Sequence, residues 1–320
     1  AKGIAMVHSV CGVGFPGDID VTLESLFARG LRNPLAWRLF FQTMDVAKVQ
    51  KRKLPRIGGC FVTALDGCYG SEDAALLEPY ANDAANSGIL YHDDATVTDF
   101  TKCANRAGLQ IEMHAIGDRA FRQAVDAIAA ALADFPRTDH RHTIIHACLP
   151  TTEGLQTCAR LGIHLAVQPA FLHWDQEPLE FVTSILGPRA DRISPLATMQ
   201  RMGIVMAGGS DGPCTLPDPI EGIWAACNQY VANESLSVQQ AFDLFTRNAA
   251  ILGFDEAERG SLETGKRADL VLLDRNPFAV PVTELRSVRV KQLLLDGKPY
   301  RPGQGRLSLI LRGLFSRRKI

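Results

Sequence analysis

Short apolar runs typical of buried strands recur along the first two thirds of the chain, separated by stretches with helical periodicity. Seven runs fit strands: residues 3–10, 36–44, 59–67, 109–117, 141–148, 163–171 and 203–211. Strands that alternate with helices at this spacing indicate parallel β/α units. Seven such strands are one short of the eight that close a TIM barrel. The pattern therefore predicts an α/β fold, a TIM-like (β/α)8 barrel that lacks its first strand.

The segment "LQIEMHAIGD" (109–118) shows how such a strand is patterned. Leu109, Ile111 and Met113 share one face, because side chains alternate along a strand. The other face carries polar residues, which run from Gln110 to His114 in steps of two. An exposed edge strand fits this alternation, and so does a barrel strand with helices outside and a polar interior.

The pattern changes after residue 255. The segments "GSLETGKRADLVLLD" and "VRVKQLLLDGKPY" have the alternation and turn residues of strands, and they predict β structure outside the barrel between about 260 and 300. We therefore expect a barrel over 1–255, the C-terminal part of a small β-sandwich domain over 256–303, and a basic amphipathic tail over 304–320. The preceding stretch "SVQQAFDLFTRNAAILGF" predicts helix with Ser237 as its N-cap.

Composition narrows the class of protein. The 320 residues are 46% hydrophobic with a formal net charge of -1, which argues against a broad nucleic-acid or membrane surface. The tail "GRLSLILRGLFSRRKI" is the exception, because it mixes leucines with arginines; a membrane or partner contact and a docked terminus are both open there. Eight cysteines without a CxxC pair, and no signal peptide, predict a cytoplasmic protein. The start, without Met and almost directly in a strand, looks like the middle of a longer protein.

Four polar residues stand at or near the C-terminal ends of predicted strands: His114, His146, Gln168 and Asp211. Active sites of α/β barrels lie at that face. Two histidines and a carboxylate there suit a Zn²⁺-type site with open positions. Each residue alone has another reading, as a hydrogen-bonded core or turn residue, but the ordered series favours a site.

The other histidines are weaker candidates. His142 and His164 share strand parity with His146 and Gln168 but lie one layer deeper, so structural hydrogen bonds are expected of them. His173 follows the strand 163–171 on the site-bearing side and is a candidate substrate contact. The sequence leaves open whether His8 faces the barrel interior.

Several motifs, taken in order, resemble the amidohydrolase superfamily and, more narrowly, amidohydrolase family 3. They are "LDGCYGSEDAALLEPYAND", "HAIGDRA", "IIHACLP", "AVQPAF", "AGGSDGPC" and "GSLETGKRADLVLLD". The resemblance implies a metal-bearing (β/α)8 barrel, a small β-sandwich built from both chain ends, and hydrolysis of amide and related C–N bonds. It also implies His114, His146 and Asp211 as ligands from the fifth, sixth and eighth barrel strands.

Two departures from the family pattern matter. The His-x-His pair of the family's first strand is absent, and His140 and His142, which have that spacing, precede the sixth strand. The chain is therefore expected to be N-terminally truncated. The lysine that bridges two metals in many members aligns with Val62, so one divalent ion, Zn²⁺, is favoured. Cys60 and Asp66 share parity with Val62 and could each offer a ligand.

The implied chemistry is metal-assisted attack of water on a small-molecule, non-peptide amide or formamide. The resemblance gives Asp211 the role of general base, with oxyanion stabilisation by His146 or a nearby donor. Five residues are expected at the substrate: Ser71, Glu78, Gln168, His173 and Trp174. A non-catalytic relic of such a barrel, or another metal-assisted reaction such as deamination or isomerisation, remains open. Homo-oligomerisation is also open, and we expect the 320-residue chain alone to be poorly stable and poorly active.

Overall fold

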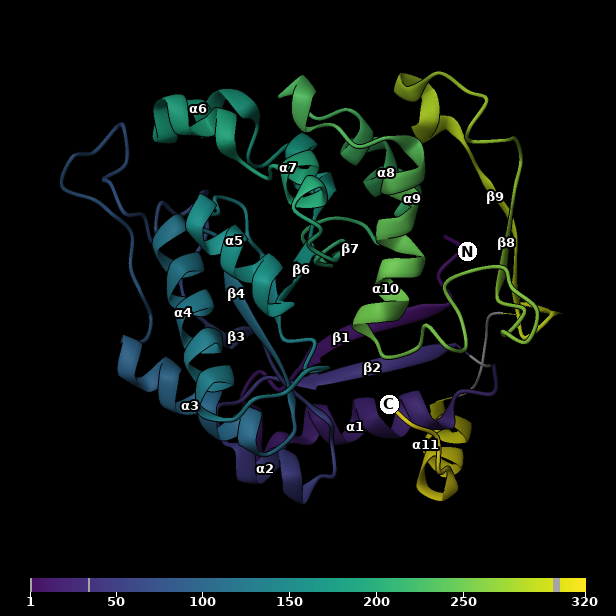
Figure 1. Ribbon diagram of the computed structural model, residues 1–320. Helices are drawn as coiled ribbons and strands as arrows, with labels where there is room; N and C mark the ends of the chain where they lie inside the picture. Colours follow the sequence, from purple (N-terminus) through teal and green to yellow (C-terminus); the bar gives the residue numbers. More distant parts are fainter. Residues whose placement is uncertain (1, 34, 302–305) are drawn as a thin grey trace.

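The computed structural model describes residues 2–33, 35–301 and 306–320 (Figure 1). A parallel sheet of seven strands is ordered β1-β2-β3-β4-β5-β6-β7, as the sequence predicts. The strands are β1 (Met6–Cys11), β2 (Ala36–Phe41), β3 (Arg56–Ala64), β4 (Gln110–Ala115), β5 (Thr143–His146), β6 (His164–Val167) and β7 (Met206–Gly208). The order confirms a TIM-like barrel that lacks a strand, because each strand pairs with its neighbour in the chain.

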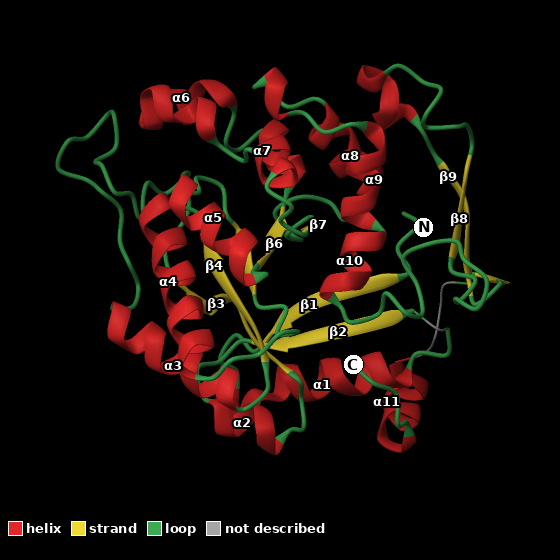
Figure 2. Cartoon of the chain, in the orientation of Figure 1, coloured by secondary structure: helices red, strands yellow, loops and turns green. Residues whose placement is uncertain are grey.

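Helices surround this sheet, and α11 packs on α1 rather than on the strands (Figure 2). They are α1 (Ile19–Gly30), α2 (Val46–Lys51), α3 (Asp94–Arg106), α4 (Asp118–Asp134), α5 (Thr152–Leu161), α6 (Leu179–Leu186), α7 (Leu196–Arg201), α8 (Pro219–Cys227), α9 (Val238–Phe245), α10 (Arg247–Leu252) and α11 (Arg306–Phe315). Side-chain caps fix several starts. Ser237 forms a capping box with Gln240 at the start of α9, which confirms the predicted cap.

The position of strand β4 decides between the two explanations of the alternating segment 109–118, an exposed edge strand or an interior barrel strand. All six of its residues are buried, including Gln110, Glu112 and His114. The strand lies between β3 and β5, so it is an interior barrel strand rather than an exposed edge. Its polar side chains must therefore find partners inside the protein, because unpaired buried polar groups are costly.

The seven-stranded sheet does not close on itself, and β1 and β7 are its edge strands. The segment around α10 contacts both edges. Helix α10 packs against β7, and a Cβ on Gly253, just beyond the helix, would lie 3.0 Å from His8 Nε2 of β1. The buried Asp255 then forms an ion pair with the partly buried Arg38 of β2. These contacts tie the two sides of the opening together near the N-terminal ends of the strands.

A second, antiparallel sheet has the order β10-β9-β8, with β8 (Leu270–Leu273), β9 (Val290–Leu295) and β10 (Lys298–Pro299). Strands outside the barrel between 260 and 300 are therefore confirmed. Within the described residues, the outer edge of β8 has no partner strand, and Val271 and Leu272 are exposed. The predicted domain boundaries at 255/256 and 303/304 stay predictions, and the second lies outside the described residues.

The C-terminal tail is docked. Helix α11 crosses α1 so closely that a Cβ on Gly30 would lie 1.9 Å from Leu309 O, and one on Gly313 would lie 2.2 Å from Leu26 O. Arg318 then donates to backbone carbonyls at the end of α1, and Ile320 is buried. Across the described residues, we find no helix with the length and apolar character needed to cross a bilayer.

Candidate metal centre

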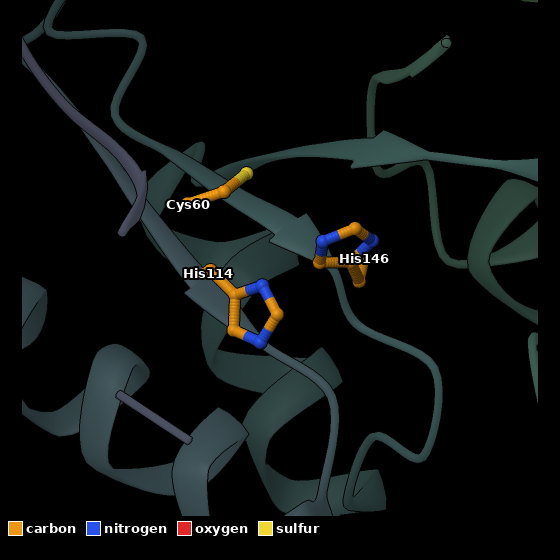
Figure 3. Close-up of side chains that lie close together, drawn as sticks. All are labelled: Cys60, His114 and His146. Carbon is orange, nitrogen blue, oxygen red and sulfur yellow. The ribbon is translucent and has the colours of Figure 1, made fainter. Parts of the chain in front are cut away.

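Three side chains from adjacent strands converge at the C-terminal end of the sheet (Figure 3). Cys60 of β3, His114 of β4 and His146 of β5 each offer one ligand atom, and these atoms all lie within 4.8 Å of one another. The two imidazole rings meet edge to face with centroids 4.5 Å apart. Metal–ligand bonds of about 2.0–2.3 Å fit this spacing, because two ligands of one ion lie about 3–4.6 Å apart.

His114 is oriented by its Nε2 atom. That nitrogen lies 3.1 Å from the carbonyl oxygen of Gly67 and 3.4 Å from Asp66 Oδ1. A carbonyl can only accept, so Nε2 carries the proton and Nδ1 holds the lone pair. Nδ1 is buried and has no hydrogen-bond partner among the described residues. A buried, unpaired lone pair is unfavourable by itself, and a bound cation would satisfy it.

His146 is oriented the other way round. Its Nδ1 lies 2.7 Å from Gln168 Oε1, an acceptor when Gln168 Nε2 donates to the Ala166 carbonyl. The lone pair is then on Nε2, which lies 4.0 Å from Asp211 Oδ2. Burial, with His114 adding to it, holds the pKa of His146 well below its usual range. The ring is therefore neutral near pH 7, the form that binds a metal ion.

This geometry bears on two predicted roles. The proton of His146 faces Gln168, and its other nitrogen faces the cluster and Asp211. Oxyanion stabilisation by His146 or a nearby donor stays a prediction. Both amide atoms of Gln168 are hydrogen-bonded inside the protein, to His146 and to the Ala166 carbonyl, and its contact with substrate also stays a prediction.

Asp211 follows β7 and lies at the rim of the cluster. Burial raises the pKa of its carboxyl, while nearby His114 lowers it. Asp211 and His146 both have left-handed backbone, with φ of 50° and 73°. Non-glycine residues rarely adopt this conformation, and it concentrates at functional sites. The backbone thus turns both side chains from strand ends toward the same point.

Cys60 is a ligand candidate that the strand pattern offers only as one of two alternatives, beside Asp66. The β3–β4 pairing slips between Gly59, opposite Met113, and Ala64, opposite His114, so the intervening residues bulge. Gln42 Oε1 holds the bulge by accepting the N–H groups of Cys60 and Phe61, both at 2.8 Å. Burial holds the pKa of the Cys60 thiol well above its usual range. A bound metal would replace that proton, because coordinating thiols are deprotonated.

The bulge also explains two other predictions at this strand. Parity fails inside a bulge, and Val62, the position aligned with the family lysine, is 40% exposed while Cys60 joins the cluster. Asp66, the other residue weighed as a ligand, is fully occupied elsewhere. Its carboxylate accepts the N–H groups of Ala75, Ile116 and Gly117. It therefore anchors the loops that surround His114.

The expected substrate residues lie on the surrounding loops. Trp174 stacks on Phe171 at 5.1 Å, and Phe171 stacks on His146 at 5.9 Å, so an aromatic layer extends from the cluster. Ser71 is exposed and donates to Asp73. Glu78 is also exposed, and His173 Nε2 lies 2.8 Å from the carbonyl of Asn228. Substrate contact by these residues stays a prediction.

The described donor set fits a divalent metal. A thiolate, two imidazoles and a neighbouring carboxylate are ligands that Zn²⁺ prefers. The unpaired Nδ1 of His114 faces no other partner in the described chain, and the neutral His146 offers Nε2. Both observations are what a metal centre requires and what a purely structural histidine pair would avoid.

Comparison with known proteins places this centre in a family. The family model described as "Amidohydrolase family" matches residues 60–300, which include the cluster and the small sheet. The chain belongs to the amidohydrolase family. The match confirms the resemblance seen in the motifs, and it covers every residue of the proposed centre.

Individual relatives of this amidohydrolase agree. "Putative amidohydrolase YtcJ" of Bacillus subtilis is 29% identical over 93% of the chain and 58% of its own length. "N-substituted formamide deformylase" of Arthrobacter pascens is 26% identical over 75% of the chain and 45% of its own length. An uncharacterized metal-dependent hydrolase from Pyrococcus furiosus superposes with a TM-score of 0.69 at 26% identity, over 84% of this chain and 56% of that one. The chain thus spans about half to three fifths of these relatives.

Proposed function

We propose that this amidohydrolase hydrolyses a C–N bond of a small, non-peptide amide or formamide with a divalent metal, Zn²⁺, held by Cys60, His114 and His146. The observation that most supports this proposal is the cluster of three ligand atoms, in which His114 Nδ1 has no hydrogen-bond partner among the described residues. Similarity to a formamide deformylase supports the substrate class. When bound, the ion would lower the pKa of a water molecule and polarise the scissile carbonyl.

The chain's own residues carry the proton. Asp211 Oδ2 lies 4.0 Å from His146 Nε2, at the edge of the ligand cluster, where a water beside the ligands can reach it. Asp211 takes a proton from the attacking water as the new C–O bond forms. It returns that proton to the nitrogen as the C–N bond breaks, which leaves an acid and an amine. Burial raises the pKa of Asp211, which strengthens it as a base.

The remaining residues orient the site. Gln168 fixes the tautomer of His146, and Gly67 O with Asp66 fixes that of His114. The aromatic layer of Phe171 and Trp174 covers the cluster on one side and supplies an apolar wall for the acyl or N-substituent. Such a wall excludes water and strengthens the electrostatic interactions beside it.

The test is metal content and turnover by the 320-residue chain on a panel of N-substituted formamides and amino-acid amides. Cys60→Ser should lower bound zinc and turnover together. Cys103→Ser is the matched control, because Cys103 is an exposed cysteine on α3. Asp211→Asn should abolish turnover while zinc remains. Zinc binding that is unchanged by Cys60→Ser and His114→Ala would refute the proposed centre.

A further inference from the structure

Helix α11 presents an apolar face to solvent. Four side chains on it are strongly exposed: Leu307 by 70%, Leu311 by 51%, Leu314 by 59% and Phe315 by 87%. Their spacing of four, three and one residues puts them on one side of a helix. We call these four residues the α11 face. Such a contiguous group differs from the scattered exposed leucines of ordinary surfaces and marks an interaction site.

The opposite side of the helix is already used. Gly313 packs on the backbone at Leu26 and Gly30 packs on the backbone at Leu309, so α11 is seated on α1 through close backbone contact. Arg318 strengthens the seat by donating to the carbonyls of Leu31 and Asn33. The α11 face therefore points away from the protein, and Figure 1 shows α11 on the outer rim, away from the convergence of strands.

The charge of the tail identifies the partner. Residues 301–320 contain six basic residues and no Asp or Glu, whereas the whole chain has a net charge of -1. Arg312, Arg317 and Lys319 are exposed beside the α11 face. A neighbouring groove of about 440 Å³ adds further charged residues, although Arg38 and Arg259 in it are largely buried and paired with Asp255 and Asp269. Its charged lining is Arg32, Arg38, Glu258, Arg259, Arg267, Asp296, Lys298, Arg318 and Lys319.

We propose that the α11 face docks on an anionic lipid bilayer. The apolar side chains would enter the boundary between headgroups and acyl chains, while the surrounding cations contact lipid phosphates and carboxylates. Amphipathic helices with a basic rim bind membranes in this way, and each cation near an anionic surface adds to the attraction. A second copy of the chain is the less suitable occupant, because it would bring an equally basic tail against this one.

The experiment is sedimentation of the full 320-residue chain with vesicles of phosphatidylcholine alone or with 30 mol% phosphatidylserine. We expect binding to the anionic vesicles that falls at least several-fold in 0.5 M NaCl, because exposed charges are screened. The triple variant Leu311→Ser, Leu314→Ser, Phe315→Ser should bind about tenfold or more weakly. Leu216→Ser is the control, because Leu216 is 78% exposed on the loop between β7 and α8 and should leave binding unchanged.

Two further variants separate the contributions and guard against misfolding. Arg317→Glu with Lys319→Glu should reduce binding to anionic vesicles and leave the thermal unfolding midpoint unchanged, because both side chains are exposed. Phe315→Trp should give a blue-shifted emission on adding anionic vesicles, which locates the contact at α11. Equal binding to neutral and anionic vesicles, unaltered binding by the triple variant, or no binding by the parent chain would overturn the proposal. So would a dimer, seen without vesicles, that the triple variant dissolves.

Discussion

Two pairs of neighbouring histidines lie in the same barrel at the same spacing. The ring centroids of His114 and His146 are 4.5 Å apart, and so are those of His140 and His142. All four residues are buried. Spacing and burial therefore do not distinguish the pair at the C-terminal ends of the strands from the pair at their N-terminal ends.

Hydrogen bonding does distinguish them. The Nδ1 atom of His140 accepts the backbone N–H of His142, and its Nε2 atom lies 2.9 Å from Leu161 O. His142 accepts the N–H of Ile111 on Nδ1, and its Nε2 lies 3.0 Å from Asn105 Oδ1. Every ring nitrogen of this pair is satisfied by the fold.

In the other pair, each ring has one nitrogen fixed by the protein and one that is not. His114 Nδ1 is unpaired, and His146 Nε2 lies 4.0 Å from Asp211 Oδ2, beyond hydrogen-bonding distance. The difference between the two pairs is that His140 and His142 use both nitrogens in the fold, whereas His114 and His146 each keep one lone pair that faces the cluster. Mutation should therefore cost stability in the first pair and metal affinity in the second.

The largest effect should follow removal of a ligand. His114→Ala should lower zinc affinity by about 100-fold or more, because it removes one of the three proposed protein ligands from a total binding energy of about 10–16 kcal/mol. The metal-free chain should lose only about 1 kcal/mol of stability, the value of the single bond to Gly67 O. Competition with a chromogenic chelator measures the affinity. A loss of several kcal/mol with unchanged affinity would reverse the assignment of the two pairs.

Next in size is the effect of removing a structural ring. His142→Ala should destabilise the chain by about 2–3 kcal/mol, because it leaves the buried Ile111 N–H without the ring nitrogen that accepts it and removes a donor to Asn105 Oδ1. Urea denaturation in chelator measures the free energy of unfolding. Zinc affinity of the folded protein should stay within about twofold of the parent, and a drop as large as that of His114→Ala would contradict the comparison.

The strands and the direction of their side chains could be predicted from the sequence, because the alternation along a strand is a local property and the strands follow one another in chain order. All seven strands were predicted, and His142 was placed one layer below His146 by parity alone. The predicted structural role fits His142. His164 was given the same role, but its Nδ1 has no hydrogen-bond partner among the described residues. The position of a residue in the strand alternation predicts the face to which its side chain points, but not whether a hydrogen-bond partner lies on that face.

The site was only partly predictable. His114, His146 and Asp211 were placed near one another because each ends a strand of a parallel sheet. The place of Cys60 in the cluster depends on a bulge that the alternation of one strand does not reveal. The contact of Gln168 with His146 depends on the pairing of β5 with β6, which the pattern of one strand does not reveal either. Both features come from contacts between strands rather than within one.

The stability of the metal-free chain should depend on pH through buried groups, most of which lie outside the metal cluster. Burial, with nearby cations, lowers the pKa of His8 and of His164 to about 4. Both are neutral when folded and titrate near 6.5 when unfolded, so their stabilisation is lost as pH falls from about 6.5 toward 4. Burial raises the pKa of Glu112 to about 8. Glu112 acts oppositely, because its contribution is lost as pH rises from about 4.5 toward 8.

Taken alone, these three groups give a stability maximum near pH 6.5 and a net loss of about 2 kcal/mol between pH 6.5 and 4.5, at about 1.4 kcal/mol per proton and pH unit. Burial also lowers the pKa values of His140, His142 and His146, so the acid-side loss should exceed that figure and the maximum should lie at or above pH 6.5. Above it, Glu112 alone gives the decline. Glu112→Gln should abolish the decline between pH 6.5 and 8 and leave the acid side in place. Urea midpoints across pH 4.5–8 in chelator give the test, and an alkaline decline that survives Glu112→Gln would show that another group causes it.

The smallest effect on zinc affinity should come from replacing the glutamine that orients a ligand histidine. Gln168 and Gln110 are both buried glutamines on the barrel interior, one at each end. Gln168→Ala frees His146 to rotate or to change tautomer, so zinc affinity should fall about tenfold, the lower end of what loss of such a partner costs. Gln110 instead accepts from Arg56 and donates to the carbonyls of Arg141 and Leu252. Gln110→Ala should therefore lower the unfolding free energy and leave zinc affinity unchanged. Equal effects of the two variants on zinc affinity, measured in the same chelator titration, would mean that the two ends of the barrel are not divided between binding and stability as we argue.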